Sequence, residues 1–276
     1  MKPFEEKVAI VTGGGSGIGQ ALCEELARRG SMVIVADVND GCARQVAAAI
    51  MRRGGRAYAA HVDVSKEEEV KQLVDETVSA YGHLDYLFNN AGIVIGGDAR
   101  DLTSEQWRRV FDVNFYGVLY GTLAAYLVML KQGCGHIVNT ASAAGLLPGP
   151  GNAPYGASKH AIVGLSLSLR LEAADLGVNV SVVCPGFVRT NIYQSMILAN
   201  IPREQVLARL PRHMMEAEHA AHVILDSVSR NQAVIVFPAS MRWIWRLYRV
   251  FPRLLDGVWL TLMREFRKYR GTPDTR

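Results

Sequence analysis

The segment YGASK places Tyr155 and Lys159 four positions apart. In a helix such residues share one face, so the phenol and the ammonium group would point into the same space. A free tyrosine, with a pKa of about 10, exchanges protons poorly near neutrality. A lysine cation about 4 Å away, in an effective dielectric of about 20, could lower that pKa by about 3 units. The pair could therefore act as acid and base, although the same spacing is also common in exposed helices.

Other polar residues stand where predicted strands end. Ser142 ends a strand 13 residues before Tyr155, and its hydroxyl could bind a substrate oxygen beside the phenol. Asn114 lies in an apolar helical run, where a buried amide needs a hydrogen-bond partner. The segments NNAG (89–92) and PGFVRT (185–190) follow two further strands. Because the carboxyl ends of parallel strands meet at one edge of a sheet, these residues would gather where ligands bind.

The first predicted strand runs into the glycine-rich segment TGGGSGIG (12–19) and then into a helix. Glycines in such a turn let the backbone approach a pyrophosphate, and the helix N-terminus offers free N–H groups. A glycine cluster alone is weak evidence, because turns collect glycine in any case. The residues of this turn that we predict to contact a dinucleotide are Gly13, Ser16, Gly17, Ile18 and Gly19.

Asp37 ends the second predicted strand, 18 residues after Gly19, where a carboxylate would hold the adenosine ribose hydroxyls. A carboxylate there repels the 2′-phosphate of NADP, and neither Val38 nor Ser16 supplies a compensating cation. The sequence therefore predicts NAD as the cofactor, with NADP less favoured. Alternatively, Asp37 only begins the next turn or caps the following helix, and it could do both.

Short apolar segments rich in Val and Ile alternate with helical patterns along the chain. Such alternation predicts an α/β fold in one domain, with a parallel sheet covered by helices on both faces. The predicted strands are 8–12, 32–37, 56–63, 84–90, 136–142, 178–185 and 233–237, and the predicted helices are 17–29, 41–53, 66–81, 104–131, 154–176 and 216–229.

In their order and spacing, these motifs resemble those of the short-chain dehydrogenase/reductase family. The resemblance implies a single Rossmann-like domain with a doubly wound, seven-stranded parallel sheet. It also implies reversible hydride transfer between a nicotinamide and an alcohol or ketone, and a homodimer or homotetramer. The matching elements, between residues 7 and about 237, are TGGGSGIG, Asp37, the Asp63–Val64 pair, NNAG, Asn114, Ser142, YGASK and PGFVRT.

The resemblance further implies a role for each matched residue. Tyr155 would be the general acid and base, and Ser142 would position the substrate oxygen. Lys159 would lower the pKa of Tyr155 and bind the nicotinamide ribose, while Asn114 would hold a water that relays protons to Lys159. Further cofactor contacts would come from Asp63 and Val64 at the adenine, Asn90 near the ribose, and Val188 and Thr190 near the nicotinamide carboxamide.

Residues 190–215 resemble the mobile substrate lid of the family and are rich in apolar side chains. This composition predicts a lipophilic alcohol or ketone, of steroid, retinoid, fatty or terpenoid type. The same side chains could instead simply dock the lid on the core, and Arg203, Arg209 and Arg212 leave a phosphorylated or acyl-carrier substrate open. The residues predicted to contact the substrate are Ser142, Leu146, Leu147, Tyr155 and Tyr193.

Composition narrows the function classes. The chain has 276 residues and a net charge of +4. Segment 241–276 holds nine of its 30 basic and three of its 26 acidic residues, so the first 240 residues are near neutral and no nucleic-acid partner is expected. Four cysteines without metal-ligand spacing predict no metal site and a reducing, cytoplasmic location. No run is expected to reach the ~20 apolar residues of a membrane span.

Residues 241–276 are predicted to extend beyond a catalytic domain at 1–240. Over 241–270 the pattern is that of a basic amphipathic helix, which Pro252 should break or kink. Such a helix could contact an anionic membrane surface peripherally, pack against another subunit or cover the substrate cleft. One face carries Arg242, Arg246, Arg249 and Arg253, and the other carries Trp243, Leu247, Val250 and Leu254.

Together these patterns predict an NAD-dependent oxidoreductase acting on a small apolar secondary alcohol or ketone. One alternative is an NADP-dependent ketone or 3-oxoacyl reductase. Alternatives of another class are a nonenzymatic NAD-sensing protein and a membrane-surface scaffold. The complete Ser–Tyr–Lys–Asn set favours the enzyme, because a sensor has no need of an acid and base.

Overall fold

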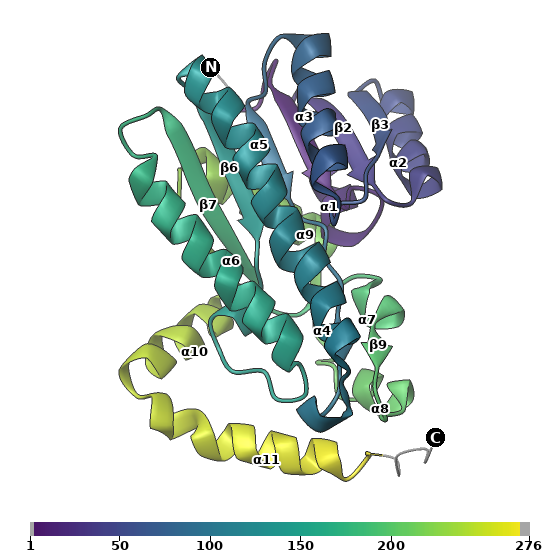
Figure 1. Ribbon diagram of the computed structural model, residues 1–276, viewed down its shortest axis with the longest axis vertical. Coiled ribbons are helices and arrows are strands. Elements are labelled where there is room, and N and C mark those ends of the chain that lie inside the picture. The colour runs from purple at the N-terminus through teal and green to yellow at the C-terminus, as the bar shows by residue number, and fades with distance from the viewer. Residues whose placement is uncertain (1–2, 271–276) are drawn as a thin grey trace.

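The computed structural model describes residues 3–270, and its centre is a sheet of seven parallel strands (Figure 1). The strands are β1 (Val8–Thr12), β2 (Met32–Asp37), β3 (Arg56–His61), β4 (Tyr86–Asn89), β6 (Gly135–Thr140), β7 (Val178–Pro185) and β11 (Val234–Phe237). They lie in the order β11-β7-β6-β4-β1-β2-β3. The central strands are buried on both faces, as the apolar segments require. The predicted Rossmann-like α/β fold is confirmed.

Helices form a layer on each face of the sheet. The first layer consists of α1 (Gly17–Arg28), α2 (Asp40–Arg52) and α9 (Ala217–Ser229), and the second of α3 (Glu67–Tyr81), α5 (Gly117–Gln132) and α6 (Ala153–Glu172). The first layer packs through side chains such as Leu26 and Ile224, and the second through Leu73 and Met129. Apolar cores therefore enclose the sheet on both faces, with a third cluster around Ile162, and leave its carboxyl edge open for the site.

The single helix expected over 104–131 is interrupted. A π-helical turn at Asp112–Tyr116 separates α4 (Ser104–Phe111) from α5. The wider turn carries Asn114, whose side chain is fully buried. Its amide nitrogen donates to the Ile93 carbonyl at 3.0 Å and to Ser158 Oγ at 3.2 Å, and its oxygen accepts from the Ile93 N–H at 2.8 Å. The break thus turns a polar amide inward with its hydrogen bonds satisfied.

The run Ser104–Gln132 is long and apolar enough to cross a membrane, by length and composition only. We expected no segment to reach that length, and this expectation was wrong. In the structure the run covers the sheet, and Ala125 and Met129 belong to the core. Packing against the sheet accounts for part of its apolar character.

Four polar side chains form a hydrogen-bonded network inside the second layer. The Asn89 amide nitrogen donates to Asn139 Oδ1 at 2.9 Å and to Thr122 Oγ1 at 3.2 Å. The Asn139 amide nitrogen in turn donates to Ser166 Oγ at 3.0 Å. Because these residues lie on β4, α5, β6 and α6, the network fixes α6 against the ends of the central strands.

The segment expected to be the lid, 190–215, is held by two short parallel ladders. One ladder joins β8 (Val188–Arg189) to β10 (Met215–Glu216), and the other joins β5 (Ile95–Gly96) to β9 (Ile197–Leu198). Between the ladders lie α7 (Ile192–Ser195) and α8 (Arg203–Leu207). The first ladder therefore joins the two ends of the lid to each other, and the second fastens the middle of the lid to the segment after β4.

Two helices follow β11. α10 (Ala239–Val250) ends just before a 3-10 turn at Pro252–Leu255, and α11 (Asp256–Arg267) comes next. The break predicted near Pro252 is confirmed. In Figure 1 α11 (yellow) runs beyond the ends of α6 and α4 towards α8.

Candidate active site

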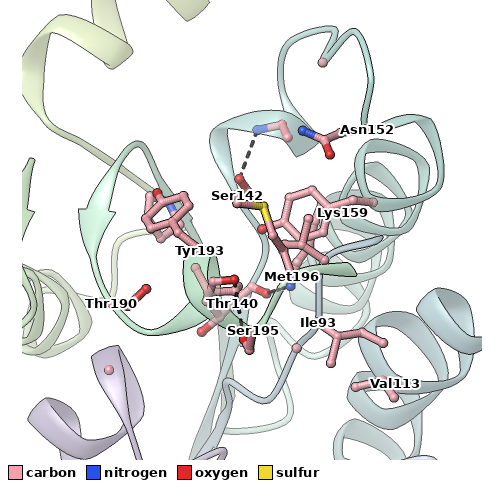
Figure 2. Close-up of a pocket in the computed structure, with 18 of the residues that line it drawn as sticks. Ile93, Val113, Thr140, Ser142, Asn152, Lys159, Thr190, Tyr193, Ser195 and Met196 are labelled. Carbon is pink, nitrogen blue, oxygen red and sulfur yellow. Dashed lines mark hydrogen bonds between the residues drawn. The ribbon is translucent and has the colours of Figure 1, made fainter. Parts of the chain in front are cut away.

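A cleft of about 1180 Å³ opens at the carboxyl edge of the sheet. Residues that follow four different strands line it: Gly13 after β1, Asn90 after β4, Ser142 after β6 and Gly186 after β7. The loop after β6, α4, the lid and α11 supply further walls. Ser142, Lys159 and Tyr193 all reach into this cavity in Figure 2. Segments far apart in sequence meet here because parallel strands end at the same edge.

Tyr155 and Lys159 lie in the first turns of α6 and both line the cleft. Lys159 is only 3% exposed, and its ammonium donates to the Thr140 carbonyl at 2.8 Å. Its Nζ lies 5.7 Å from the centre of the Tyr155 ring. The Ser142 hydroxyl forms a hydrogen bond with the Tyr155 phenol and accepts the Ala144 N–H at 3.1 Å. The three residues therefore form one cluster at the end of β6.

The expectation that Lys159 lowers the pKa of Tyr155 is not met in this geometry. Burial raises the pKa of Tyr155, and its hydrogen bond with Ser142 offsets only part of that rise. The ammonium faces the Thr140 carbonyl, and burial lowers the pKa of Lys159 to about 8. The expected shift assumed an ammonium about 4 Å from the phenol oxygen, and here desolvation outweighs any such attraction.

Gly92 separates Asn114 from Lys159. A Cβ at this position would lie 3.2 Å from Asn114 Oδ1 and 3.4 Å from Lys159 Nζ. The glycine therefore leaves the space between the two polar atoms free of a side chain. Asn114 itself lies behind the cleft wall, bonded to Ile93, rather than on the cleft surface.

The glycine-rich turn offers bare backbone at the N-terminus of α1. Gly13 has a φ of 64°, and a Cβ at Gly19 would lie 2.0 Å from the Gly13 carbonyl oxygen. The Asn90 amide braces the same turn by donating to the Thr12 carbonyl at 3.1 Å. Gly13, Ser16, Gly17 and Ile18 line the cleft. A turn that admits no side chain before a helix N-terminus fits the diphosphate of a dinucleotide.

The two predicted carboxylates lie in the same cleft. Asp37 accepts from the Gly15 N–H at 2.9 Å and from the Asn39 N–H at 2.8 Å. It therefore supports both the glycine turn and the entry to α2, as the structural alternative anticipated. Asp63 accepts from the Ser65 N–H at 3.1 Å and from its hydroxyl at 2.7 Å. Both carboxylates remain on the wall where ribose and adenine would lie.

Most of the predicted site residues line the cleft, and three do not. Gly19 packs beneath the turn and Asn114 lies behind the wall. Leu146, predicted to contact substrate, packs instead against the core cluster that includes Ile162. Those that line it are Gly13, Ser16, Gly17, Ile18, Asp37, Asp63, Val64, Asn90, Ser142, Leu147, Tyr155, Lys159, Val188, Thr190 and Tyr193. Residues 3–270 contain no cluster of three or more His, Cys, Asp or Glu that could hold a metal.

The sequence analysis left open that segment 241–270 covers the cleft, but it did not identify the residues of α11 that do so. Trp259, Leu262 and Phe266 line it, and their spacing of three and four residues was a readable signal. The apolar stripe that the sequence analysis named begins instead on α10, where Trp243 is 66% exposed to solvent. Apolar periodicity alone did not reveal that α11 supplies more of the cleft wall than α10, which contributes Met241.

Comparison with known proteins agrees with this architecture. A family model described as "short chain dehydrogenase" matches residues 7–199. A cyclohexanol dehydrogenase from Acinetobacter sp. (strain SE19) is 40% identical over 188 residues, which cover 68% of this chain and 75% of the relative. A 3beta-hydroxysteroid dehydrogenase 2 from Eggerthella lenta is 35% identical over 188 residues, covering 67% and 72%.

A solved structure extends the likeness to most of the chain. A short chain dehydrogenase/reductase from Burkholderia phymatum, crystallised in complex with NAD, aligns with a TM-score of 0.85 and 31% identity. The alignment covers 92% of this chain and 96% of that one. Fold and site thus define an oxidoreductase with a Rossmann-like nucleotide-binding domain. The chain belongs to the short-chain dehydrogenase family.

Replacing Lys159 with Met should change how stability depends on pH. The folded protein lowers the lysine pKa from 10.5 to about 8, so the unfolded state binds more protons between those values. Stability of the wild type should therefore rise across that window relative to Lys159→Met, by about 3 kcal/mol at most. Urea unfolding at stepped pH measures this, with Lys131→Met on the surface as the control. A constant difference across the window would contradict the buried-cation account.

Proposed function

We propose that this protein is an NAD-dependent dehydrogenase of lipophilic secondary alcohols, and a reductase of the matching ketones. The observation that carries the proposal is the cluster of Ser142, Tyr155 and Lys159 in one cleft with the glycine turn. A nicotinamide dinucleotide bound along that turn supplies the hydride acceptor for alcohol oxidation. The chain's own residues supply the proton chemistry.

Tyr155 removes the hydroxyl proton of the alcohol, and Ser142 holds the same oxygen by a hydrogen bond. The base is the phenolate form of Tyr155, which becomes a phenol as it takes this proton. The buried Lys159 cation, with its Nζ 5.7 Å from the ring centre, favours the phenolate against the burial that opposes it, because charges interact strongly inside a protein. We place a water beside Gly92, between Asn114 Oδ1 and Lys159 Nζ, as the outlet for the proton. Asn114 is a positioning residue here, since its other hydrogen bonds fix it to Ile93 and Ser158.

The chemistry of the cleft supports an apolar substrate. Its lid wall includes the polar side chains of Asn191, Gln205 and Arg209 and a larger apolar group: Ile192, Tyr193, Met196, Leu198 and Ile201. Burial raises the pKa of Tyr193 to about 12, so its hydroxyl stays protonated and can donate a hydrogen bond. Two of the relatives are named as dehydrogenases of apolar cyclic alcohols, one of cyclohexanol and the other of a hydroxysteroid.

Tyr155→Phe should abolish alcohol oxidation while NADH still binds. The substitution removes the acid and base but keeps the ring, so the expected loss in kcat is at least about 100-fold. Nicotinamide fluorescence measures binding, and a panel of cyclic, steroid and fatty alcohols, with a 3-oxoacyl thioester in the reverse direction, measures turnover. Tyr81→Phe, at a tyrosine outside the cleft, is the matched control. Full activity in Tyr155→Phe would refute the assigned role.

Asp37→Asn should weaken the preference for NAD over NADP. The amide can still accept the Gly15 hydrogen bond, but it removes the charge that repels a 2′-phosphate. We expect kcat/KM with NAD to fall about tenfold and the ratio between the cofactors to shift by more. Asp40→Asn, three residues further along the chain and paired with Arg44, is the control. Wild-type preference for NADP would overturn the proposal and favour the ketone or 3-oxoacyl reductase alternative.

We also propose that the protein self-associates through α5 and α6. Leu123 and Leu127 on α5 are 47% and 61% exposed, and Leu171 on α6 is 79% exposed. A helix that is apolar on its outer face as well as its inner face is expected to be covered on both. Sedimentation velocity should give a dimer or tetramer, and Leu127→Glu with Leu171→Glu should dissociate it. Met51→Glu, at an exposed apolar residue of α2, should not. A monomeric wild type would refute the proposal.

We propose, finally, that α10 brings this cytoplasmic enzyme to an anionic membrane surface. Its exposed Trp243, Leu247 and Val250 are flanked by Arg246 and Arg249, an arrangement that complements acidic headgroups. The wild type should float with phosphatidylserine vesicles at low salt and be released by high salt. Replacing both arginines with Gln should prevent flotation, whereas Arg44→Gln with Arg52→Gln should not. No flotation of the wild type at low salt would refute the membrane proposal. A smaller oligomer in the double arginine variant would also refute it and would show that this face of α10 is a contact between copies of the protein.

A further inference from the structure

The last helix in the part of the chain that the structure describes, α11, lies over one end of the active-site cleft. Trp259, Leu262 and Phe266 on α11, with Tyr269 just beyond it, line the cleft together with Tyr155 and the lid. The family model ends at residue 199, so this wall belongs to a part of the chain outside the shared motifs. In Figure 1 α11 passes the ends of α6 and α4, where the strands of the sheet also point.

Ion pairs hold α11 in this position. Arg267 Nε donates to Asp98 at 2.9 Å, and Arg270 Nε donates to Asp101 at 2.6 Å. Asp98 is only 6% exposed. Burial raises the pKa of Asp98, but hydrogen bonds from Arg267 and Arg100 more than offset it and hold the pKa below its usual range. The carboxylates therefore stay charged at neutral pH and tether the end of α11 beside α4.

Two further contacts fit the helix to the rest of the cleft. Phe266 packs on the loop after β6 so closely that a Cβ at Gly151 would lie 2.7 Å from its ring. On the lid, the Arg209 guanidinium lies 4.2 Å from the centre of the Tyr269 ring. Because the helix contacts the lid, this loop and the turn before α4, it closes one end of the cleft.

One polar atom in this wall is unsatisfied. Trp259 Nε1 is, within residues 3–270, the one buried side-chain nitrogen or oxygen that has no hydrogen-bond partner. A buried N–H without an acceptor is costly, and such groups in native proteins call for an explanation. Because Trp259 lines the cleft, an acceptor on a bound ligand could satisfy this group after a small rotation of the indole.

We propose that α11 is the specificity wall for the end of the substrate remote from the reacting carbon. Leu262 and Phe266 contact the apolar body, and the Trp259 indole N–H donates to an acceptor at its far end. The substrate class is thus a lipophilic secondary alcohol with a remote ether, carbonyl or hydroxyl oxygen. This inference rests on the proposed alcohol dehydrogenase function.

The test uses the full-length protein and a series of 2-alkanols of increasing length, each with and without a terminal methyl ether. In the wild type, at least one ether should have a KM about three- to tenfold lower than its unsubstituted partner, the effect of one hydrogen bond. Trp259→Phe keeps the aromatic ring but lacks the N–H, so it should remove this preference. Phe266→Ala should raise KM for the long alcohols about tenfold or more and leave that for butan-2-ol unchanged.

Matched controls lie on the outer face of the same helix. Val258→Ala and Leu260→Ala remove exposed apolar side chains that do not line the cleft, and should leave every KM unchanged. A Trp259→Phe variant with the wild-type ratio of ether to unsubstituted KM, or a wild type that shows no ether preference at any length, would overturn the indole assignment. Unchanged KM values in Phe266→Ala would overturn the wall. Absence of turnover with butan-2-ol and every longer alcohol would instead count against the proposed function itself.

Discussion

The hydrogen bond from Lys159 to the Thr140 carbonyl ties the helix of the acid and base to the end of a central strand. Thr140 ends β6, and Ser142 follows two residues later, so the same bond sets Tyr155 beside Ser142. A buried ammonium is expensive unless its donors are satisfied, which makes this contact hard to exchange for another. The buried network of Asn89, Asn139 and Ser166 supports the same junction from within the core.

Burying these two groups is unfavourable for stability, and the same burial changes how they titrate. Burial lowers the pKa of Lys159 and raises that of Tyr155, so both groups are held away from their solution behaviour by the same desolvated environment. Perturbed titration in a cleft is typical of functional sites, because charge that develops there interacts strongly. The sheet and its two helix layers provide the rigid frame that keeps these groups in place.

The part of the protein that matches the family model is followed by a terminal segment that the model does not cover. The glycine turn, the strand ends and the first turns of α6 lie within the span matched by the family model. α11 lies outside it, yet it lines the same cleft and is tethered by Arg267 and Arg270. Such a division lets the chemistry stay constant while the wall that meets the rest of a substrate changes.

The sequence by itself determined the parallel sheet and the gathering of Gly13, Asp37, Ser142 and Tyr155 at its edge. Strand and helix periods are local properties, and strands joined through helices have few ways to pair. Only the tertiary structure decided the rest. It interrupts the long helix at Asn114 and turns Leu146 into the core. It also directs the Lys159 ammonium to a carbonyl and lays α11 along the cleft, to which α10 adds Met241. These outcomes depend on burial and on partners distant in sequence, such as Asp98 for Arg267, and no local pattern encodes them.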